Sequence, residues 1–217
     1  MDILKKTKKL LLLAFVIVVV SQISAMSNTD SGPDSDLQKA FKESYEYEAK
    51  GQYSDAINVL KNVYAENVYE INLRLGWLYY LNKQHDESVS YYRKSIDLMP
   101  YCIEAKFGIV NPLAVQEKWD KVYEQYDAIL VIDPQNTLAN YRLGLGYYYK
   151  ADYTNAYKQF EKVVKLYPFD YSSVLMFAWS NYMLGKNKEA ELLFNKVLLM
   201  SPDDKSALEG LGLLGKK

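Results

Sequence analysis

Apolar residues recur at steps of three and four along most of the chain, which is the spacing of one face of an α-helix. Short polar breaks separate the apolar runs, as at Gly51, Asn82-Lys83 and Gly185-Lys186. A proline follows every second run in most of the chain, where a residue without an N–H cannot continue a helix. The pattern therefore predicts an all-α fold of helices arranged in antiparallel pairs.

The predicted pairs repeat at a fixed interval, which indicates a repeat architecture. Four of the six prolines recur at one constant spacing, namely Pro100, Pro134, Pro168 and Pro202. The first unit is slightly shorter than the others, so its turn near Asn67 should be tighter. Five pairs and one further helix follow from this register: 37–68, 69–102, 103–136, 137–170, 171–204, and a single capping helix over 205–214.

Fixed residue types also recur inside each unit. One unit contains Leu143-Gly144, Tyr147, Ala156, Phe160 and Pro168 at characteristic spacings. From residue 37 to the C-terminus the chain resembles the tetratricopeptide repeat family, whose 34-residue unit carries this pattern. The resemblance implies a right-handed superhelical solenoid with a concave groove lined mainly by the first helix of each pair.

Two kinds of small or polar residue have an expected structural role. Gly76 and Gly144 lie inside predicted helices, where glycine costs about 1 kcal/mol relative to alanine. We expect the second helix of the pair to approach closely there, with Ala156 as the small counterpart. Three residues stand where the next helix should begin and are expected to cap it, namely Asn136, Asp170 and Asp204.

The third unit departs from the pattern. Val110 replaces the close-packing glycine, and Pro112 lies inside the first helix. A proline there removes the hydrogen bond to the carbonyl of Gly108 and should kink the helix. One interpretation is a local irregularity that neighbouring helices tolerate, and the other is a groove widened at Phe107 and Asn111.

The N-terminus has the pattern of an export signal. Four lysines precede the apolar run Leu10–Val20, and a stretch of small and polar residues follows it through Ala25. We expect 1–25 to be a cleaved signal peptide and 26–36 a flexible linker, with the repeats over 37–217. An uncleaved anchor is the alternative, because the apolar stretch can be read on through Met26 and then approaches the length of a membrane span. Either way, the protein is expected in the periplasm or cell envelope, touching a membrane only through 1–25 if these residues are retained.

Composition narrows the function. One cysteine cannot form an intrachain disulfide, and one cysteine with one histidine cannot supply a usual zinc site. Without residues 1–25 the chain has 22 basic and 26 acidic side chains, a net charge of −4, which disfavours nucleic acid. No metal or cofactor is therefore expected.

Candidate catalytic signals also fail. His85 lies in a polar turn and is interpreted as a solvated residue, while Cys102 has no activating partner nearby in sequence. The string from Gly210 to Gly215 matches G-x-G-x-x-G but follows a helix rather than a strand, so we interpret it as helix packing and terminal fraying. An enzyme is not expected.

The remaining candidate is a protein-binding surface. Aligning the units places a set of mostly aromatic side chains on the groove side of first helices: Tyr45, Trp77, Tyr80, Phe107, Asn111, Tyr141, Tyr148, Tyr149, Trp179 and Tyr182. Tyrosine and tryptophan are enriched at binding hot spots. A stripe at helical spacing is more often core, so the alternative for each residue is internal packing.

The charge of the groove bears on the partner. Some members of the family hold an acidic C-terminal tail with lysine and asparagine, but the corresponding positions here are aromatic or aliphatic, and only Arg74 and Arg142 add positive charge. An extended apolar or aromatic segment, or a partner helix, fits better. We therefore expect an exported scaffold that binds a protein or peptide and supports assembly of a cell-envelope complex. A self-associating structural subunit is the alternative.

Overall fold

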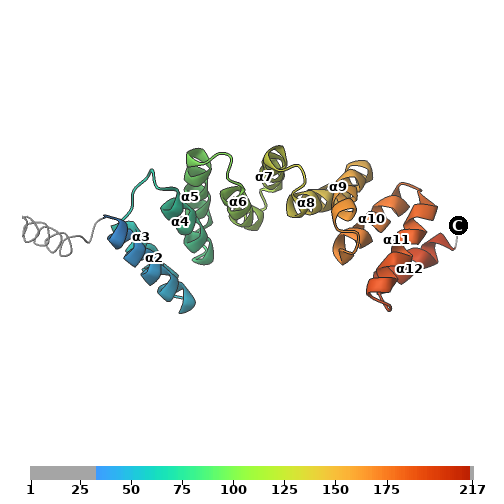
Figure 1. Ribbon diagram of the computed structural model, residues 1–217, viewed down its shortest axis with the longest axis horizontal. Helices are drawn as coiled ribbons and strands as arrows, with labels where there is room; N and C mark the ends of the chain where they lie inside the picture. Colours follow the sequence, from blue (N-terminus) through green and yellow to red (C-terminus); the bar gives the residue numbers. More distant parts are fainter. Residues whose placement is uncertain (1–32, 216–217) are drawn as a thin grey trace, which may run out of the picture. The chain divides into compact units, whose positions relative to one another are not determined.

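The computed structural model describes residues 33–215, a stretch of α-helices joined by short turns and loops (Figure 1). Contacts divide the chain into two compact units, Met1–Tyr64 and Ala65–Lys217. The described part of the first unit contains α2 (Pro33–Ala49) and α3 (Tyr53–Asn62), which pack against each other. The described part of the second unit contains the other helices: α4 (Tyr69–Leu81), α5 (His85–Leu98), α6 (Ile103–Val115), α7 (Trp119–Ile132), α8 (Thr137–Tyr149), α9 (Tyr153–Leu166), α10 (Tyr171–Met183), α11 (Asn187–Met200) and α12 (Lys205–Leu214).

The predicted pairing of helices is confirmed. In the second unit each first helix packs against its own second helix, and each second helix packs against the next first helix. In Figure 1 these helices follow one another in chain order, from α4 to the closing helix α12. The all-α helical-repeat fold is therefore established within the described residues.

The start of α2 corrects one expected boundary. The stretch 26–36 was expected to be linker, but α2 begins at Pro33 and includes 33–36. Proline suits the first turn of a helix, because its fixed φ is already helical and its missing N–H would have no partner there. The predicted signal peptide 1–25 and the rest of the linker, 26–32, lie outside the described residues.

Helix ends follow the local chemistry that the sequence predicted. Each proline of the repeating series comes just after the end of a second helix, as Pro100 does after Leu98. The side chains of Asn136, Asp170 and Asp204 accept hydrogen bonds from backbone N–H groups at 3.0, 2.9 and 2.8 Å, so all three cap helices. Asp152 caps α9 in the same way, and its hydrogen bonds from Asn155 lower the pKa of its carboxyl.

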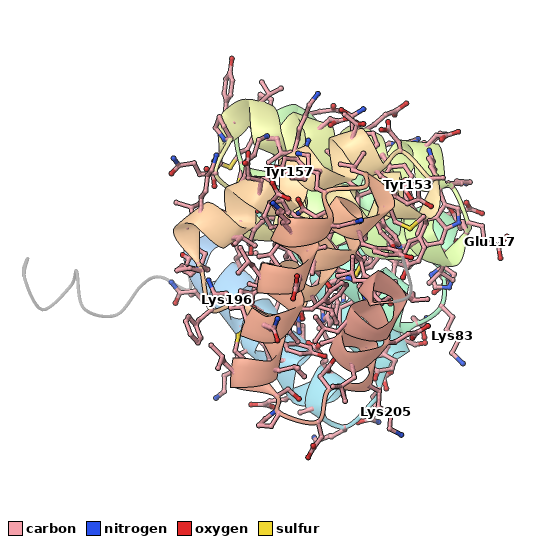
Figure 2. All side chains as sticks on the ribbon, turned by 90° about the vertical axis from the view of Figure 1, so that its right-hand side faces the viewer. Lys83, Glu117, Tyr153, Tyr157, Lys196 and Lys205 are labelled. Carbon is pink, nitrogen blue, oxygen red and sulfur yellow. The ribbon has the colours of Figure 1, made fainter. Side chains whose placement is uncertain are left out.

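The turn inside each pair contains one residue with left-handed backbone. Gly51 and Gly185 adopt φ of 71° and 73°, while Lys83, Glu117 and Ala151 adopt φ of 61°, 56° and 60°. All five are exposed and occupy equivalent positions in the five successive helix pairs. Figure 2 shows the side chains of Lys83 and Glu117 pointing away from the ribbon. The turn geometry is thus set by position in the repeat and not by glycine alone.

The glycines inside helices face aromatic rings, which corrects the expected counterpart. A Cβ on Gly144 would lie 2.8 Å from the ring of Phe160, and one on Gly76 would lie 2.8 Å from the ring of Tyr92. The close approach was expected, but the nearest atoms belong to the aromatic residue of the second helix and not to Ala156. In the pair α4 and α5, the small residue of the second helix faces the backbone of the glycine instead: the hydroxyl of Ser88 donates to the carbonyl of Gly76 at 2.6 Å.

Candidate protein-binding trough

The aromatic residue of a second helix forms the joint between neighbouring pairs. The ring of Tyr92 lies against Gly76 of its own pair and also against Gly108 of the next, where a Cβ would lie 2.2 Å away. Phe194 lies similarly between Ala178, which is fully buried, and Gly210 of α12. Small residues at matching places in the two flanking first helices therefore let three helices pack closely around each of these rings.

Tyr126 has no small residue at either of these places. The matching residue of its own first helix is Val110, and that of the next first helix is Arg142. Val122 also stands in α7 where the other pairs have serine or alanine. Branched and long side chains keep the helix backbones away from the ring. The helices α6, α7 and α8 therefore cannot pack as closely around Tyr126 as neighbouring helices do around Tyr92.

Helix contacts show the resulting opening. First helices touch each other elsewhere in the unit, α4 against α6 and α8 against α10, but α6 and α8 have no comparable contact. The helices α6 and α7 also pack less closely than those of the other pairs. Pro112 lies on this segment, buried within α6, which continues as one helix to Val115.

A trough of about 880 Å³ occupies the opening between α6, α7 and α8. This volume falls within the range of about 300–1,000 Å³ that is typical of ligand pockets. The residues that line it are Phe107, Val110, Asn111, Ala114, Trp119, Val122, Tyr123, Tyr126, Leu138, Arg142, Leu145, Gly146, Tyr149 and Lys150. Its rim remains open to solvent, because Trp119, Leu138 and Tyr149 are 50%, 48% and 80% exposed.

One wall of the trough depends on a glycine in α8. The ring of Tyr123 lies where a Cβ on Gly146 would be, at 2.3 Å. The ammonium of Lys150 lies 4.5 Å from the centre of the Tyr123 ring and 3.5 Å from a carboxylate oxygen of Asp120. Gly146 thus allows a ring from α7 to pack against α8, and Lys150 holds it there by a cation–π contact.

No acidic side chain is among the residues that line the trough. Arg142 and Lys150 are its only charged lining residues, and both are basic. Carboxylates of α7 line a smaller hollow between α7 and α8, namely Asp120, Glu124 and Asp127. Burial raises the pKa of Asp127. Burial also raises the pKa of the Tyr126 hydroxyl, while the positive charge of Arg142 opposes that rise.

Three of the residues predicted for the groove line the trough, Phe107, Asn111 and Tyr149. Phe107 also packs against the ring of Tyr126, with the ring centres 6.4 Å apart. Tyr141 lines a separate hollow of about 400 Å³ between α8, α9 and α10. Of the predicted groove residues, the trough therefore contains only two from α6 and the last residue of α8.

The other predicted groove residues of α4 and α8 pack mainly on their neighbours. Trp77 is half-buried, with its ring 5.7 Å from that of Tyr80. Tyr80 in turn lies 5.8 Å from the ring of His85. Tyr148 packs edge-on against Tyr153 of α9 at 5.3 Å, and burial raises the pKa of its hydroxyl.

At the C-terminal end, Trp179 joins α10 to α12. Its indole N–H donates to the hydroxyl of Ser206 at 2.8 Å, and its ring lies edge-on to Phe194 and Tyr182. Trp179 and Tyr182 thus contribute to the packing of α10 against its neighbours. Tyr45, in α2 of the first unit, is 55% exposed.

The residues considered for catalysis occupy structural positions. His85 was interpreted as a solvated turn residue, but it is the first residue of α5 and is half-buried beside Tyr80. The Sγ of Cys102 lies 3.1 Å from the hydroxyl of Tyr69. The helix-packing interpretation places Gly210 correctly, inside α12. Within residues 33–215 no cluster of histidine, cysteine or acidic side chains could hold a metal ion, and no helix has the length and hydrophobicity of a membrane span.

Several trough residues were missed from the sequence. Trp119, Tyr123 and Lys150 come from a second helix or from the turn after α8, whereas the groove was expected to be lined by first helices. Arg142 was noted for its charge alone. A usable signal was present, because Tyr126 is the only aromatic joint of the second unit, within its described residues, that has a branched residue on one side and an arginine on the other.

Helix pairs stacked in chain order, with an apolar trough between three of the helices, define a helical-repeat protein of the kind that binds other proteins. A family profile described as "Tetratricopeptide repeat" matches residues 41–101 and 141–207. The chain belongs to the tetratricopeptide repeat family, whose members are generally non-catalytic scaffolds for protein interaction. The unmatched stretch between the two ranges, 102–140, contains α6 and α7, the irregular pair that forms most of the trough.

Solved structures share the fold at low sequence identity. A tetratricopeptide repeat protein from Parabacteroides merdae ATCC 43184 has a TM-score of 0.70 and 21% identity, covering 83% of this chain and 72% of its own. MamA has a TM-score of 0.65 and 19% identity over 75% of this chain and 90% of its own. MamA from Desulfovibrio magneticus RS-1 has a TM-score of 0.64 and 19% identity over 78% of this chain and 97% of its own. No curated protein sequence matches the chain.

Proposed function

We propose that the protein is an exported scaffold that holds an extended segment of a partner protein in the trough between α6, α7 and α8, and so supports assembly of a complex in the cell envelope. The observation that carries this proposal is the trough itself, about 880 Å³ with aromatic and aliphatic walls. Apolar hollows with a few polar groups are the usual form of a binding site. Family membership supports the scaffold role, and the N-terminal pattern of 1–25 supports export.

Site-specific photo-crosslinking in cells tests this function. A photoreactive amino acid at Asn111, which is exposed and lines the trough, should yield discrete crosslinked proteins. The same amino acid at Asn187, an exposed residue at the start of α11 that does not line the trough, is the matched control. Adducts that are equally abundant at both positions, or that persist after Ala114→Phe narrows the trough, would contradict the proposal.

Self-association is a second candidate, and exposed aliphatic residues favour it. Leu192 and Leu199 lie one above the other on α11, two turns apart, and are 72% and 75% exposed. Apolar side chains clustered on a surface often mark an interface. Sedimentation across a hundredfold range of protein concentration decides the matter, because a monomer at every concentration rules this candidate out.

Export is tested at the N-terminus of the protein isolated from its own cells. A mature chain that starts at Met26 supports cleavage of 1–25. A chain that retains these residues and fractionates with membranes supports the anchor instead. A full-length chain in the soluble cytoplasmic fraction would contradict export in either form.

A further inference from the structure

We infer that the segment held in the trough carries a large apolar side chain directly beside a carboxylate, with Arg142 as the residue that recognises the acid. The inference rests on the proposed function and adds the chemistry of the partner. The site is specific to the joint at Tyr126. There the ring meets Val110 and Arg142, whereas the rings of Tyr92 and Phe194 meet small residues on both sides.

The apolar part of the inference follows from the walls. Phe107, Tyr123 and Tyr126 contribute aromatic faces, and Val110 and Val122 are 8% and 2% exposed. A bound aromatic or branched side chain gains free energy by leaving water for such a surface, in proportion to the apolar area that it buries. The open rim suits a polypeptide that passes through more than a small molecule that must be enclosed.

The acidic part follows from the distribution of charge. No carboxylate lines the trough, and its two charged residues are both basic. Lys150 already has Asp120 at 3.5 Å, whereas Arg142 has no ion pair or hydrogen bond with any residue in 33–215. A guanidinium offers a fork of donors that matches a carboxylate in two parallel bonds. Arg142 is therefore the charged group of the trough whose donors are left for a partner.

The position of Arg142 places the acid next to the apolar anchor. Its charge acts on the hydroxyl of Tyr126, which lines the trough and whose pKa it lowers against the effect of burial. The carboxylates of α7 line the neighbouring hollow between α7 and α8, so none of them is among the side chains that line the trough. A segment with a lysine beside its apolar anchor would meet repulsion at the same place.

Selection from a display library of random twelve-residue peptides tests the inference without assuming a sequence. The purified full chain serves as bait, in parallel with an Asn111→Trp variant that fills the trough from an exposed position and with Asn187→Trp as its control. We expect peptides that are lost only with Asn111→Trp, enriched in aromatic or leucine residues with an adjacent aspartate or glutamate. Circular dichroism of each variant verifies that its helices are intact.

Titration of one enriched peptide then isolates the charge. We expect Arg142→Gln to weaken binding about tenfold and Arg142→Glu to weaken it further, while Arg93→Glu on an exposed face of α5 leaves it unchanged. Replacing the peptide's acid by its amide should cost about the same tenfold, and no further loss should occur in Arg142→Gln.

The outcomes separate the inference from the proposed function. Trough-dependent peptides without acidic enrichment, or an affinity that Arg142→Glu does not change, would overturn the inference and leave the binding trough in place. Selection that gives no peptide sensitive to Asn111→Trp would overturn the proposed function and the inference together.

Discussion

Two glycines of α12 should respond in opposite directions to the same substitution. A Cβ on Gly210 would lie 2.3 Å from Cζ of Phe194, a ring that is fully buried. A Cβ on Gly212 would meet nothing within 4 Å. Both residues lie in one helix, so the pair isolates the close approach of helix and ring from the general effect of replacing glycine.

The magnitudes follow from the geometry. Carbon atoms pack best at about 3.5 Å, so Phe194 would have to retreat by about 1.2 Å to admit Gly210→Ala. Because the Phe194 ring is fully buried, we take the upper part of the usual overpacking cost, about 2–3 kcal/mol, and the higher helix propensity of alanine returns about 1 kcal/mol. We expect Gly210→Ala to destabilise the attachment of α12 by about 1–2 kcal/mol. Gly212→Ala should stabilise the helix by about 0.5–1 kcal/mol.

Two measurements test the pair. Urea denaturation followed by circular dichroism gives the free energy of unfolding of the array. Hydrogen exchange at the indole of Trp179, which donates to Ser206 in α12, reports local detachment of that helix. If Gly210→Ala proved as stable as the native chain in both measurements, or if both variants shifted the same way, the account of aromatic joints would be refuted.

Three further substitutions test the helix joints and caps. Tyr171→Phe removes the hydrogen bond to Asp204 across successive pairs and should cost about 1 kcal/mol in urea denaturation, whereas Tyr167→Phe, at an exposed side chain, should cost nothing measurable. Tyr92→Phe should leave the free energy of unfolding at pH 7 nearly unchanged but reduce the stability that the protein loses at alkaline pH. The reason is that burial raises the pKa of Tyr92 in the fold. The stabilisation from the neutral hydroxyl is therefore complete below the unfolded pKa of about 10 and is lost as the pH rises beyond that value. A native chain whose stability from pH 9 to 11 matched that of Tyr92→Phe would contradict this assignment. Asn136→Ala should cost about 1 kcal/mol through the lost cap of α8, while Gln52→Ala, at a helix start without a side-chain cap, should cost less in the same assay.

The regular parts of the fold could be predicted because their causes are local. Proline cannot continue a helix, and an aspartate or asparagine before a helix caps it, so Pro134 and Asn136 together define a boundary without reference to the rest of the chain. Helical periodicity and the constant spacing of the prolines supplied the pairing. The start of α2 at Pro33 was missed, because a polar stretch without large apolar residues resembles a linker as much as a helix start.

The trough depended on relations that local patterns do not contain. Val110 was recognised as a departure, but its consequence appears only when Arg142, in the next first helix, is seen to act on the same side chain, Tyr126. Likewise, alignment of the units could not separate Trp179, which packs on α11 and α12, from Phe107, which opens to the trough. Groove and core positions on one helix can be adjacent in sequence. Whether a side chain is buried or faces the trough then depends on how closely the neighbouring helix packs.

The residues with left-handed backbone in the turns are positions where the stability of this array could be raised by substitution. Three of the five, Lys83, Glu117 and Ala151, carry a side chain where glycine would be free of strain, at about 1 kcal/mol each. Their side chains are exposed and take no part in the trough, so glycine at all three positions should raise stability by up to about 3 kcal/mol. That reserve is comparable to the cost of a disruptive change at the binding surface. Glycine substitutions in the turns could therefore offset the stability lost through mutations in the trough that change which partner binds. Recognition could then diverge while the scaffold stays folded.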